Sequence, residues 1–198
     1  MIKHSCTRLG WAVVLLASSV FAQESVTTPP PPPQLSVQAF SPADLAAKVP
    51  APKADDVKTL DGIMRAAYEA ISGPAGPRDW SRFRSLFLPQ ARFTEVAKER
   101  GSTFVVSWSV DEFVHDATLG FSQEGFYENA VANRPDTFGG MTQVLSSYES
   151  RHSPGEKPFQ RGVNSFQLLN DGTRWWIVSI FWDSERPDNP LPKKLLKK

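Results

Sequence analysis

Acidic, arginine and amide side chains recur on neighbouring predicted strands in the last third of the chain, where they could orient a ligand. The set is Glu128, Arg134, Glu149, Arg151, Arg161 and Asn164. Arginine suits a ligand carboxylate because its planar guanidinium donates two parallel hydrogen bonds. The same residues on adjacent antiparallel strands would also form ordinary cross-strand ion pairs. We favour ion pairs, since exposed pairs of this kind are common and weak.

The histidines do not form a recognisable metal site. His115 lies in "EFVHDA" and His152 in "YESRHS", and neither is part of an H-E-x-x-H pattern. A protein zinc site needs three or four ligands at defined spacing. The sequence also lacks a G-x-S-x-G elbow, a phosphate-binding glycine loop and a dinucleotide fingerprint. We therefore expect no metal and no cofactor, and a structural or surface role for each histidine.

Three of the six tryptophans fall in one run, "DGTRWWIVSIFWD". Alternate side chains of a strand point to opposite faces. One row would then hold Trp175, Ile177, Ser179 and Phe181, and the other Trp176, Val178, Ile180 and Trp182. Both rows are apolar, so the sequence does not say which one meets the helices. We expect most of these rings to pack in a core or an interface rather than to stack on a ligand.

The chain begins with features of a secretory signal. Lys3 and Arg8 precede an uncharged apolar run that ends in Val20-Phe21-Ala22, which predicts a signal peptide over 1–22. Cleavage there would remove Cys6, the only cysteine, so the exported chain would have no disulfide or thiolate site. Export without disulfides suits the bacterial periplasm or the outside of a bacterial cell.

Composition and charge place limits on the partners. The stretch "TTPPPPP" predicts an extended linker over 23–52, followed by a domain over 53–187 and a basic tail over 188–198. Setting aside Lys3, Arg8 and the four tail lysines leaves 16 basic against 21 acidic side chains. Such an acidic body gives no electrostatic reason to bind nucleic acid. Two leucines and four lysines in the tail would attract a membrane only weakly, so we expect no stable insertion after cleavage.

The N-terminal half of the domain predicts helices and one hairpin. Asp55 or Asp56 would cap a helix that runs to about residue 71, and Asp79 would cap a second that Pro89 ends. That second helix would carry Leu86 and Phe87 on its inner face. Residues 91–110 read as two strands around a turn near Gly101. The S-x-x-E spacing of residues 109–112 forms a capping box and starts a third helix.

The rest of the domain predicts strands near 125–135, 141–152, 162–170 and 173–183. The Asn170-Asp171-Gly172 sequence favours a tight hairpin turn between the last two. Helices that lead into an antiparallel sheet give an α+β domain with helices on one face.

This order, with the sequences "AAYEAIS", "DWSRFRSLFLPQARFTEV" and "GVNSFQLLNDGTRWWIVSIFWD", resembles the NTF2-like superfamily of SnoaL-like cyclases and ketosteroid isomerases. The resemblance covers residues 57–183, and its C-terminal half is most similar to secreted bacterial members. It implies a cone, in which three helices pack on a strongly bent antiparallel or mixed sheet with a pocket at the wide end. The other sheet face would form a homodimer. Such a fold does not fix a function.

The resemblance also implies a candidate catalytic pair. Tyr68 matches the helical tyrosine that donates to a substrate oxygen, and Glu95 matches a carboxylate general base on the first strand. The ketosteroid isomerase pattern adds an acid on the penultimate strand, but residues 164–167 read Asn-Ser-Phe-Gln. The predicted pocket lining is Tyr68, Trp80, Phe83, Glu95, Trp108, His115, Asn164, Trp176 and Trp182.

We therefore expect the domain to bind a small, largely apolar molecule in the cone pocket, with no sign of catalysis. One alternative is a cofactor-independent isomerase, dehydratase or cyclase that uses Glu95 as base and Tyr68 as donor. Another is a structural or protein-interaction module carried on the proline-rich stalk.

Overall fold

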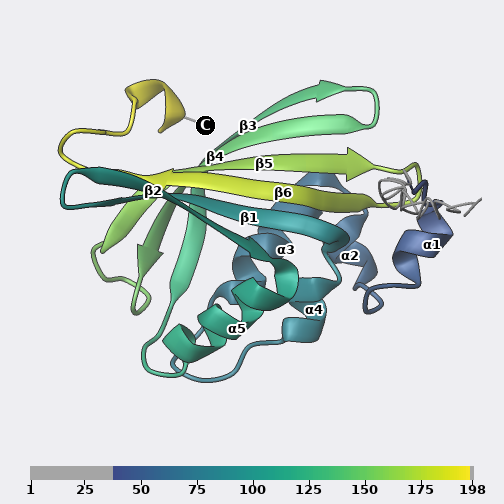
Figure 1. The fold of residues 1–198 in the computed structure, drawn as a ribbon, viewed down its shortest axis with the longest axis horizontal. Helices are drawn as coiled ribbons and strands as arrows, with labels where there is room; N and C mark the ends of the chain where they lie inside the picture. Colours follow the sequence, from purple (N-terminus) through teal and green to yellow (C-terminus); the bar gives the residue numbers. More distant parts are fainter. Residues whose placement is uncertain (1–37, 197–198) are drawn as a thin grey trace, which may run out of the picture. The chain divides into compact units, whose positions relative to one another are not determined.

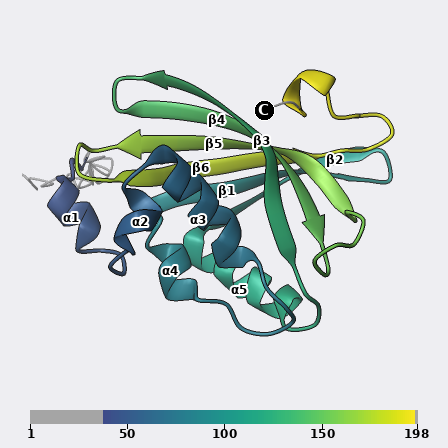
Figure 2. The ribbon, with the colours of Figure 1, turned by 180° about the vertical axis from the view of Figure 1, so that it is seen from behind.

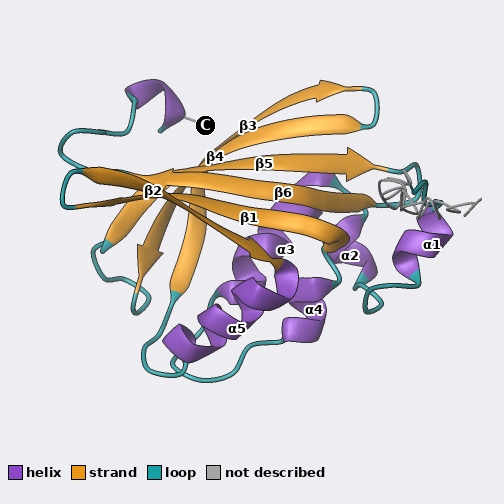
Figure 3. Ribbon diagram, viewed as in Figure 1, coloured by secondary structure: helices purple, strands orange, loops and turns teal. Residues whose placement is uncertain are grey.

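The computed structural model describes residues 38–196, and the predicted signal peptide and the first part of the linker lie outside this range. Six strands form one curved, open sheet in the order β2-β1-β6-β5-β4-β3 (Figures 1 and 3). The strands are β1 (Phe87–Glu99), β2 (Ser102–Ser109), β3 (Tyr127–Phe138), β4 (Met141–Arg151), β5 (Gln160–Asn170) and β6 (Trp175–Ser184). All neighbours pair antiparallel except β1 and β6, which pair in parallel. The sheet is therefore mixed.

The main helices lie on one side of this sheet in both ribbon views (Figures 1 and 2). The helical segments are α1 (Pro42–Ala46), α2 (Ala54–Val57), α3 (Leu60–Ile71), α4 (Trp80–Arg84), α5 (Val110–Phe121) and the 3-10 turn η1 (Lys193–Leu195). The helix-facing side of the sheet packs on α3, α4 and α5 and holds the main core. Together these elements make an α+β fold. No helix in residues 38–196 has the length and apolarity needed to cross a membrane.

The start of the first long helix differs from the prediction. Thr59, not Asp55 or Asp56, caps α3, and its hydroxyl accepts from the Gly62 N–H at 3.0 Å. Asp56 instead accepts two hydrogen bonds from Arg82 at 2.7 and 2.9 Å, and this contact ties α2 to α4. The Arg82 hydrogen bonds hold the pKa of Asp56 below its usual value. A buried carboxylate with such a partner is not free to cap a helix.

The second predicted helix is also shorter than expected. Asp79 caps α4 as predicted, but α4 ends at Arg84, and Phe87 already belongs to β1. Pro89 lies inside β1, in the stretch where its pairing with β6 is interrupted between Phe87 and Arg92. Proline lacks an N–H to donate and is tolerated in a strand at such an irregularity. The capping box at Ser109 and Glu112, by contrast, is present at the start of α5.

A bulge in β6 changes the predicted alternation of the tryptophan run. Gln167 pairs with Ser179 and Leu168 with Ile177, so Val178 has no partner on β5. An extra residue of this kind shifts all later side chains to the other face. Ile177 therefore shares the helix-facing side with Trp182 rather than opposing it. The two rows predicted from strict alternation are wrong.

The C-terminal segment returns to the sheet. Ser146 and Ser147 are neighbours on β4 and point to opposite faces. Ser146 bonds to Tyr68 on the helix side, and the Ser147 hydroxyl donates to the Leu195 carbonyl at 2.6 Å on the other side. Figure 1 shows η1 on the face of the sheet opposite α3 and α5. We call this the outer face.

Candidate functional site

A small interior chamber lies between the sheet and the helices. Its volume is about 80 Å³. Apolar side chains from α3, α4, α5 and the sheet make most of its wall, namely Ala67, Ile71, Phe83, Phe87, Phe93, Phe113, Phe166, Ile180 and Trp182. The rings pack closely, with Phe93 and Phe113 stacked at 4.4 Å between centroids. Aromatic packing of this density gives the chamber a firm wall.

One side of the chamber is polar. The hydroxyl groups of Tyr68 on α3 and Ser146 on β4 are 2.6 Å apart, and the Asn164 amide donates to the Tyr68 oxygen at 3.2 Å. Glu128 on β3 lines the same side. Its carboxylate accepts from the Ser150 hydroxyl at 2.7 Å and from Asn164. We call Tyr68, Glu128 and Asn164 the polar wall.

Burial governs the electrostatics of the polar wall. It raises the pKa of Glu128 to about 7, although hydrogen bonds from Ser150 and Asn164 oppose the rise. Burial also raises the pKa of the Tyr68 hydroxyl, and the nearby Glu128 carboxylate adds to that shift. Burial disfavours the charged form of an acid because the low-dielectric interior solvates it poorly. Near neutral pH, Glu128 can therefore either donate or accept a proton.

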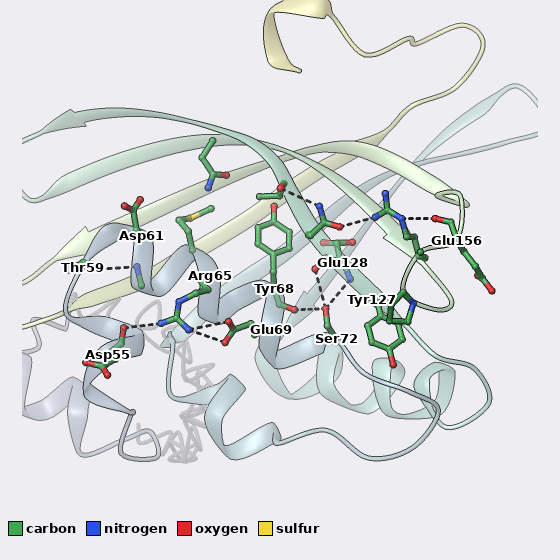
Figure 4. A pocket seen from close by; sticks show the side chains of 18 residues that line it. Asp55, Thr59, Asp61, Arg65, Tyr68, Glu69, Ser72, Tyr127, Glu128 and Glu156 are labelled. Atoms are coloured by element: carbon green, nitrogen blue, oxygen red, sulfur yellow. Dashed lines mark hydrogen bonds and ion pairs between the residues drawn. The ribbon is translucent and has the colours of Figure 1, made fainter. Parts of the chain in front are cut away.

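The C-terminal end of α3 fixes the position of Glu128. The Ser72 hydroxyl accepts from the Glu128 backbone N–H at 2.9 Å and lies 3.1 Å from the Glu128 carbonyl. The backbones of Gly73 and Phe126 exchange two further hydrogen bonds. These contacts join the helix end to the start of β3, so the carboxyl group is held on a rigid support. Figure 4 shows Tyr68, Ser72 and Glu128 together.

A wider vestibule of about 340 Å³ adjoins the chamber. Ile71, Phe113 and Trp182 line both spaces. Six further aromatic or polar side chains line the vestibule, namely Glu95, Trp108, Asp116, Phe121, Phe126 and Gln160. The rings of Trp108 and Trp182 are stacked at 5.8 Å, and the Trp108 indole donates to Asp116 at 2.8 Å.

The predicted pocket residues fall in several places. Tyr68, Phe83 and Asn164 line the chamber, Glu95 and Trp108 line the vestibule, and Trp182 lines both. Trp80 packs against Phe83 and Phe121 behind the walls. His115 is exposed in a shallow hollow on α5. The predicted catalytic pair is therefore divided between adjoining spaces, with Tyr68 in the inner one and Glu95 in the outer one.

Trp176 lines neither space. Its indole donates to Asp171 at 2.7 Å, and the Arg174 guanidinium lies 3.7 Å above its ring. The register of β6 explains this placement, because Val178 bulges between Trp176 and Trp182. Trp176 thus closes the β5–β6 hairpin.

Glu128 is the site residue that sequence reasoning assigned to surface ion pairs. Its charged neighbours along the chain favoured that reading. One signal pointed the other way, since Glu128 alternates with the small residue Ala130 at the start of a strand. Its pairing partner Ser150 is fully buried, which places this end of β3 against the interior.

An open groove lies on the other side of Glu128, between α3 and β3, with a volume of about 1140 Å³ (Figure 4). Tyr68 and Glu128 line both the groove and the chamber. Arg65 in the groove pairs with Glu69 at 3.1 Å, and Arg151 pairs with Glu149. In residues 38–196, no three His, Cys, Asp or Glu side chains gather closely enough to hold a metal ion.

Solved structures resemble this fold at low sequence identity. An uncharacterized cystatin-like protein from Caulobacter vibrioides aligns with a TM-score of 0.51 and 13% identity, over 66% of this chain and 90% of that one. A function-unknown protein from Mycobacterium tuberculosis aligns with a TM-score of 0.51 and 10% identity, over 70% and 82%. An NTF-2 like protein of unknown function from Silicibacter pomeroyi aligns with a TM-score of 0.45 and 16% identity, over 65% and 94%.

The chain shares the fold of the cystatin-like protein from Caulobacter vibrioides. The α+β fold with a bent sheet, which the sequence resemblance implied, is thereby confirmed. No protein-family model matches the sequence, and no curated protein matches it either. Likeness at this identity establishes the fold alone.

Proposed function

We propose that the NTF2-like domain binds a small, largely apolar molecule that carries one polar group. The observation that carries this proposal is the single polar wall in an otherwise aromatic chamber. Ligand sites commonly combine apolar walls with a few convergent polar groups that fix orientation. The ligand's apolar body would contact the rings, and its polar group would meet Tyr68, Glu128 or Asn164.

The sizes of the two spaces restrict the ligand. The chamber, at about 80 Å³, would take only a head group. The vestibule, at about 340 Å³, is at the lower end of the range for small-molecule sites. We infer a ligand of modest size that enters through the vestibule and places its polar end in the chamber.

Catalysis is the second candidate. A neutral carboxylic acid beside a tyrosine hydroxyl can stabilise a developing enolate oxygen, and a second carboxylate can move the proton. Glu128 supplies an acid near Tyr68, whereas residues 164–167 of the penultimate strand have none. Glu95, in the vestibule, would be the base. The arrangement of these three residues supports binding more strongly than a cofactor-independent isomerase or lyase, because Tyr68 and Glu95 do not share one cavity.

We also propose that the chain is exported to the bacterial periplasm or the extracellular space, and that it forms a homodimer through the outer face. That face exposes Val105, Val178 and Phe181, whose exposed fractions are 70%, 36% and 48%. An unpaired apolar surface on a sheet favours association with a second copy. A purely structural or interaction module would leave the chamber and vestibule without a role.

Native mass spectrometry of the protein purified from the cell envelope tests the binding proposal. We expect a bound species of defined mass that is lost in Ile71→Trp, since a larger side chain between vestibule and chamber would block the passage. Leu119→Trp, on the exposed side of α5, is the matched control and should keep the added mass. Binding that is unchanged in Ile71→Trp would contradict the proposed route.

A further inference from the structure

The charged groups along the proposed route, through the vestibule into the chamber, are all acidic. Glu95 and Asp116 line the vestibule, and Glu128 lines the chamber. Within the described part of the chain, the residues that line these two spaces include no lysine, arginine or histidine. A ligand on this route therefore meets carboxyl groups and no basic side chain.

The carboxyl group of Glu128 has no cationic partner among residues 38–196. The partners of its oxygens are the neutral side chains of Ser150 and Asn164. Two nearby arginines in the chain's fold have other partners. Arg151 pairs with Glu149, and Arg78 donates to the carbonyls of Ile71 and Gly73. A partly buried carboxylate without a counter-charge is costly, and an incoming cation would reduce that cost.

The remaining walls also suit a cation. Aromatic faces attract an ammonium group through the ring quadrupole, most strongly where water is excluded. The rings of Phe83, Phe93, Phe113, Phe166 and Trp182 surround the space into which Glu128 faces. One carboxyl group combined with an aromatic enclosure is the chemistry that recognises an ammonium head group.

We propose that the ligand is a small amine, whose ammonium group enters the chamber and pairs with Glu128 while its apolar body lies in the vestibule. This inference rests on the proposed binding function and names its ligand class. A ligand with a carbonyl or hydroxyl head would use the same chamber but would prefer neutral Glu128. The two classes therefore respond to pH in opposite directions.

The sign of the pH dependence follows from Glu128 and its neighbours. The titratable side chains around it are Tyr68 on α3 and Tyr148 on β4, with Glu95 on β1 and Asp116 on α5 towards the vestibule and Arg151 towards the groove. Burial raises the pKa of both tyrosines, so they stay neutral between pH 5.5 and 8.5. An aliphatic amine stays protonated over the same range. With the pKa of Glu128 near 7, its ionisation would strengthen amine binding by up to about 30-fold across that interval.

The test is calorimetric titration of the full chain with three probes of similar shape: phenethylammonium, 2-phenylethanol and phenylacetate. We expect phenethylammonium to bind at least about tenfold more tightly than 2-phenylethanol at pH 8.5, and its advantage to shrink as the pH falls to 5.5. Glu128→Gln should remove both the advantage of phenethylammonium over 2-phenylethanol and the pH dependence of its binding. Glu99→Gln, an exposed charge removal at the far end of β1, is the matched control.

The outcomes separate this inference from the function on which it rests. Equal affinity for phenethylammonium and 2-phenylethanol, or tighter binding of phenylacetate, would overturn the amine assignment and leave small-molecule binding intact. Failure of all three probes to bind would overturn both. If Glu128→Gln fails to fold, the pH dependence of phenethylammonium binding to the unmodified chain still tests the inference. Affinity that falls as the pH rises from 5.5 to 8.5 would contradict it.

Discussion

At the residue scale, the carboxyl group of Glu128 is the most informative group in the domain. Its pKa of about 7 means that the folded chain binds a proton there which the unfolded chain has already released. Between roughly pH 4.5 and pH 7 the folded state therefore holds more protons than the unfolded state. The contribution of Glu128 to the free energy of unfolding is therefore fully present at low pH and is lost as the pH rises through 7.

Glu128→Gln should make the protein less sensitive to this pH change. We expect the variant to be more stable than the unmodified chain at pH 8, by up to roughly 3 kcal/mol at 1.36 kcal/mol per pKa unit, and to differ little at pH 4. Urea unfolding at both pH values measures the difference. If Glu128→Gln lowers the free energy of unfolding equally at pH 8 and pH 4, the pKa of Glu128 is not raised in the folded protein, which contradicts the account.

Tyr68 provides a second test at this scale. Its hydroxyl is bonded to Ser146 and accepts from Asn164, and all three residues are buried. Tyr68→Phe removes one hydrogen bond each from Ser146 and Asn164, so we expect a loss of about 1–3 kcal/mol in the free energy of unfolding. Tyr127→Phe removes a hydroxyl from a half-buried tyrosine in the groove and should cost much less. Equal costs would argue against a buried polar wall.

At the element scale, β5 depends on a glycine. A Cβ on Gly162 would lie 2.5 Å from the Asp183 carbonyl on β6 and 2.6 Å from the Tyr148 hydroxyl on β4. Backbone and ring would both have to move, so we expect Gly162→Ala to destabilise the protein by about 1–3 kcal/mol. Gly120→Ala on α5 meets no atom within 4 Å and should be neutral or stabilising. Thermal unfolding of the two variants makes the comparison.

The same scale shows what sequence could predict. Local signals, such as the Ser109–Glu112 capping box and the Asn170-Asp171-Gly172 turn, predicted where α5 begins and where β5 turns into β6. The bulge at Val178 has no such signal. Both faces of β6 are apolar, so the sequence pattern is the same whichever residues face the helices. The contact between Asp56 and Arg82 could not be predicted from the sequence either, because the two residues lie on different helices.

At the scale of the candidate site, the fold resemblance predicted an aromatic lining. Phe83, Trp108 and Trp182 line the chamber or the vestibule, whereas Trp80 and Trp176 line neither. The polar wall could not be predicted, since Glu128, Asn164 and Tyr68 come from three separate elements that only the folded sheet brings together. Charged neighbours such as Arg134 made β3 resemble a solvated strand.

At the scale of the whole molecule, the outer face gives a prediction about assembly. We expect a dimer in solution that Phe181→Glu converts to a monomer, because two buried charges would face each other across the contact. Phe138→Glu, at the 82% exposed tip of the β3–β4 hairpin, should leave the dimer intact. Sedimentation analysis distinguishes these states, and an unmodified chain that sediments as a monomer would exclude the proposed contact.

The proposed site stands on one half-buried carboxyl group, that of Glu128, in the polar wall of an aromatic chamber. Titration of the Glu128 side chain by carbon-detected NMR tests it most directly. We predict a midpoint near pH 7 in the free protein, which falls when phenethylammonium is bound. A midpoint in the ordinary glutamate range, unchanged by the probe, would place Glu128 in solvent and contradict the proposed site.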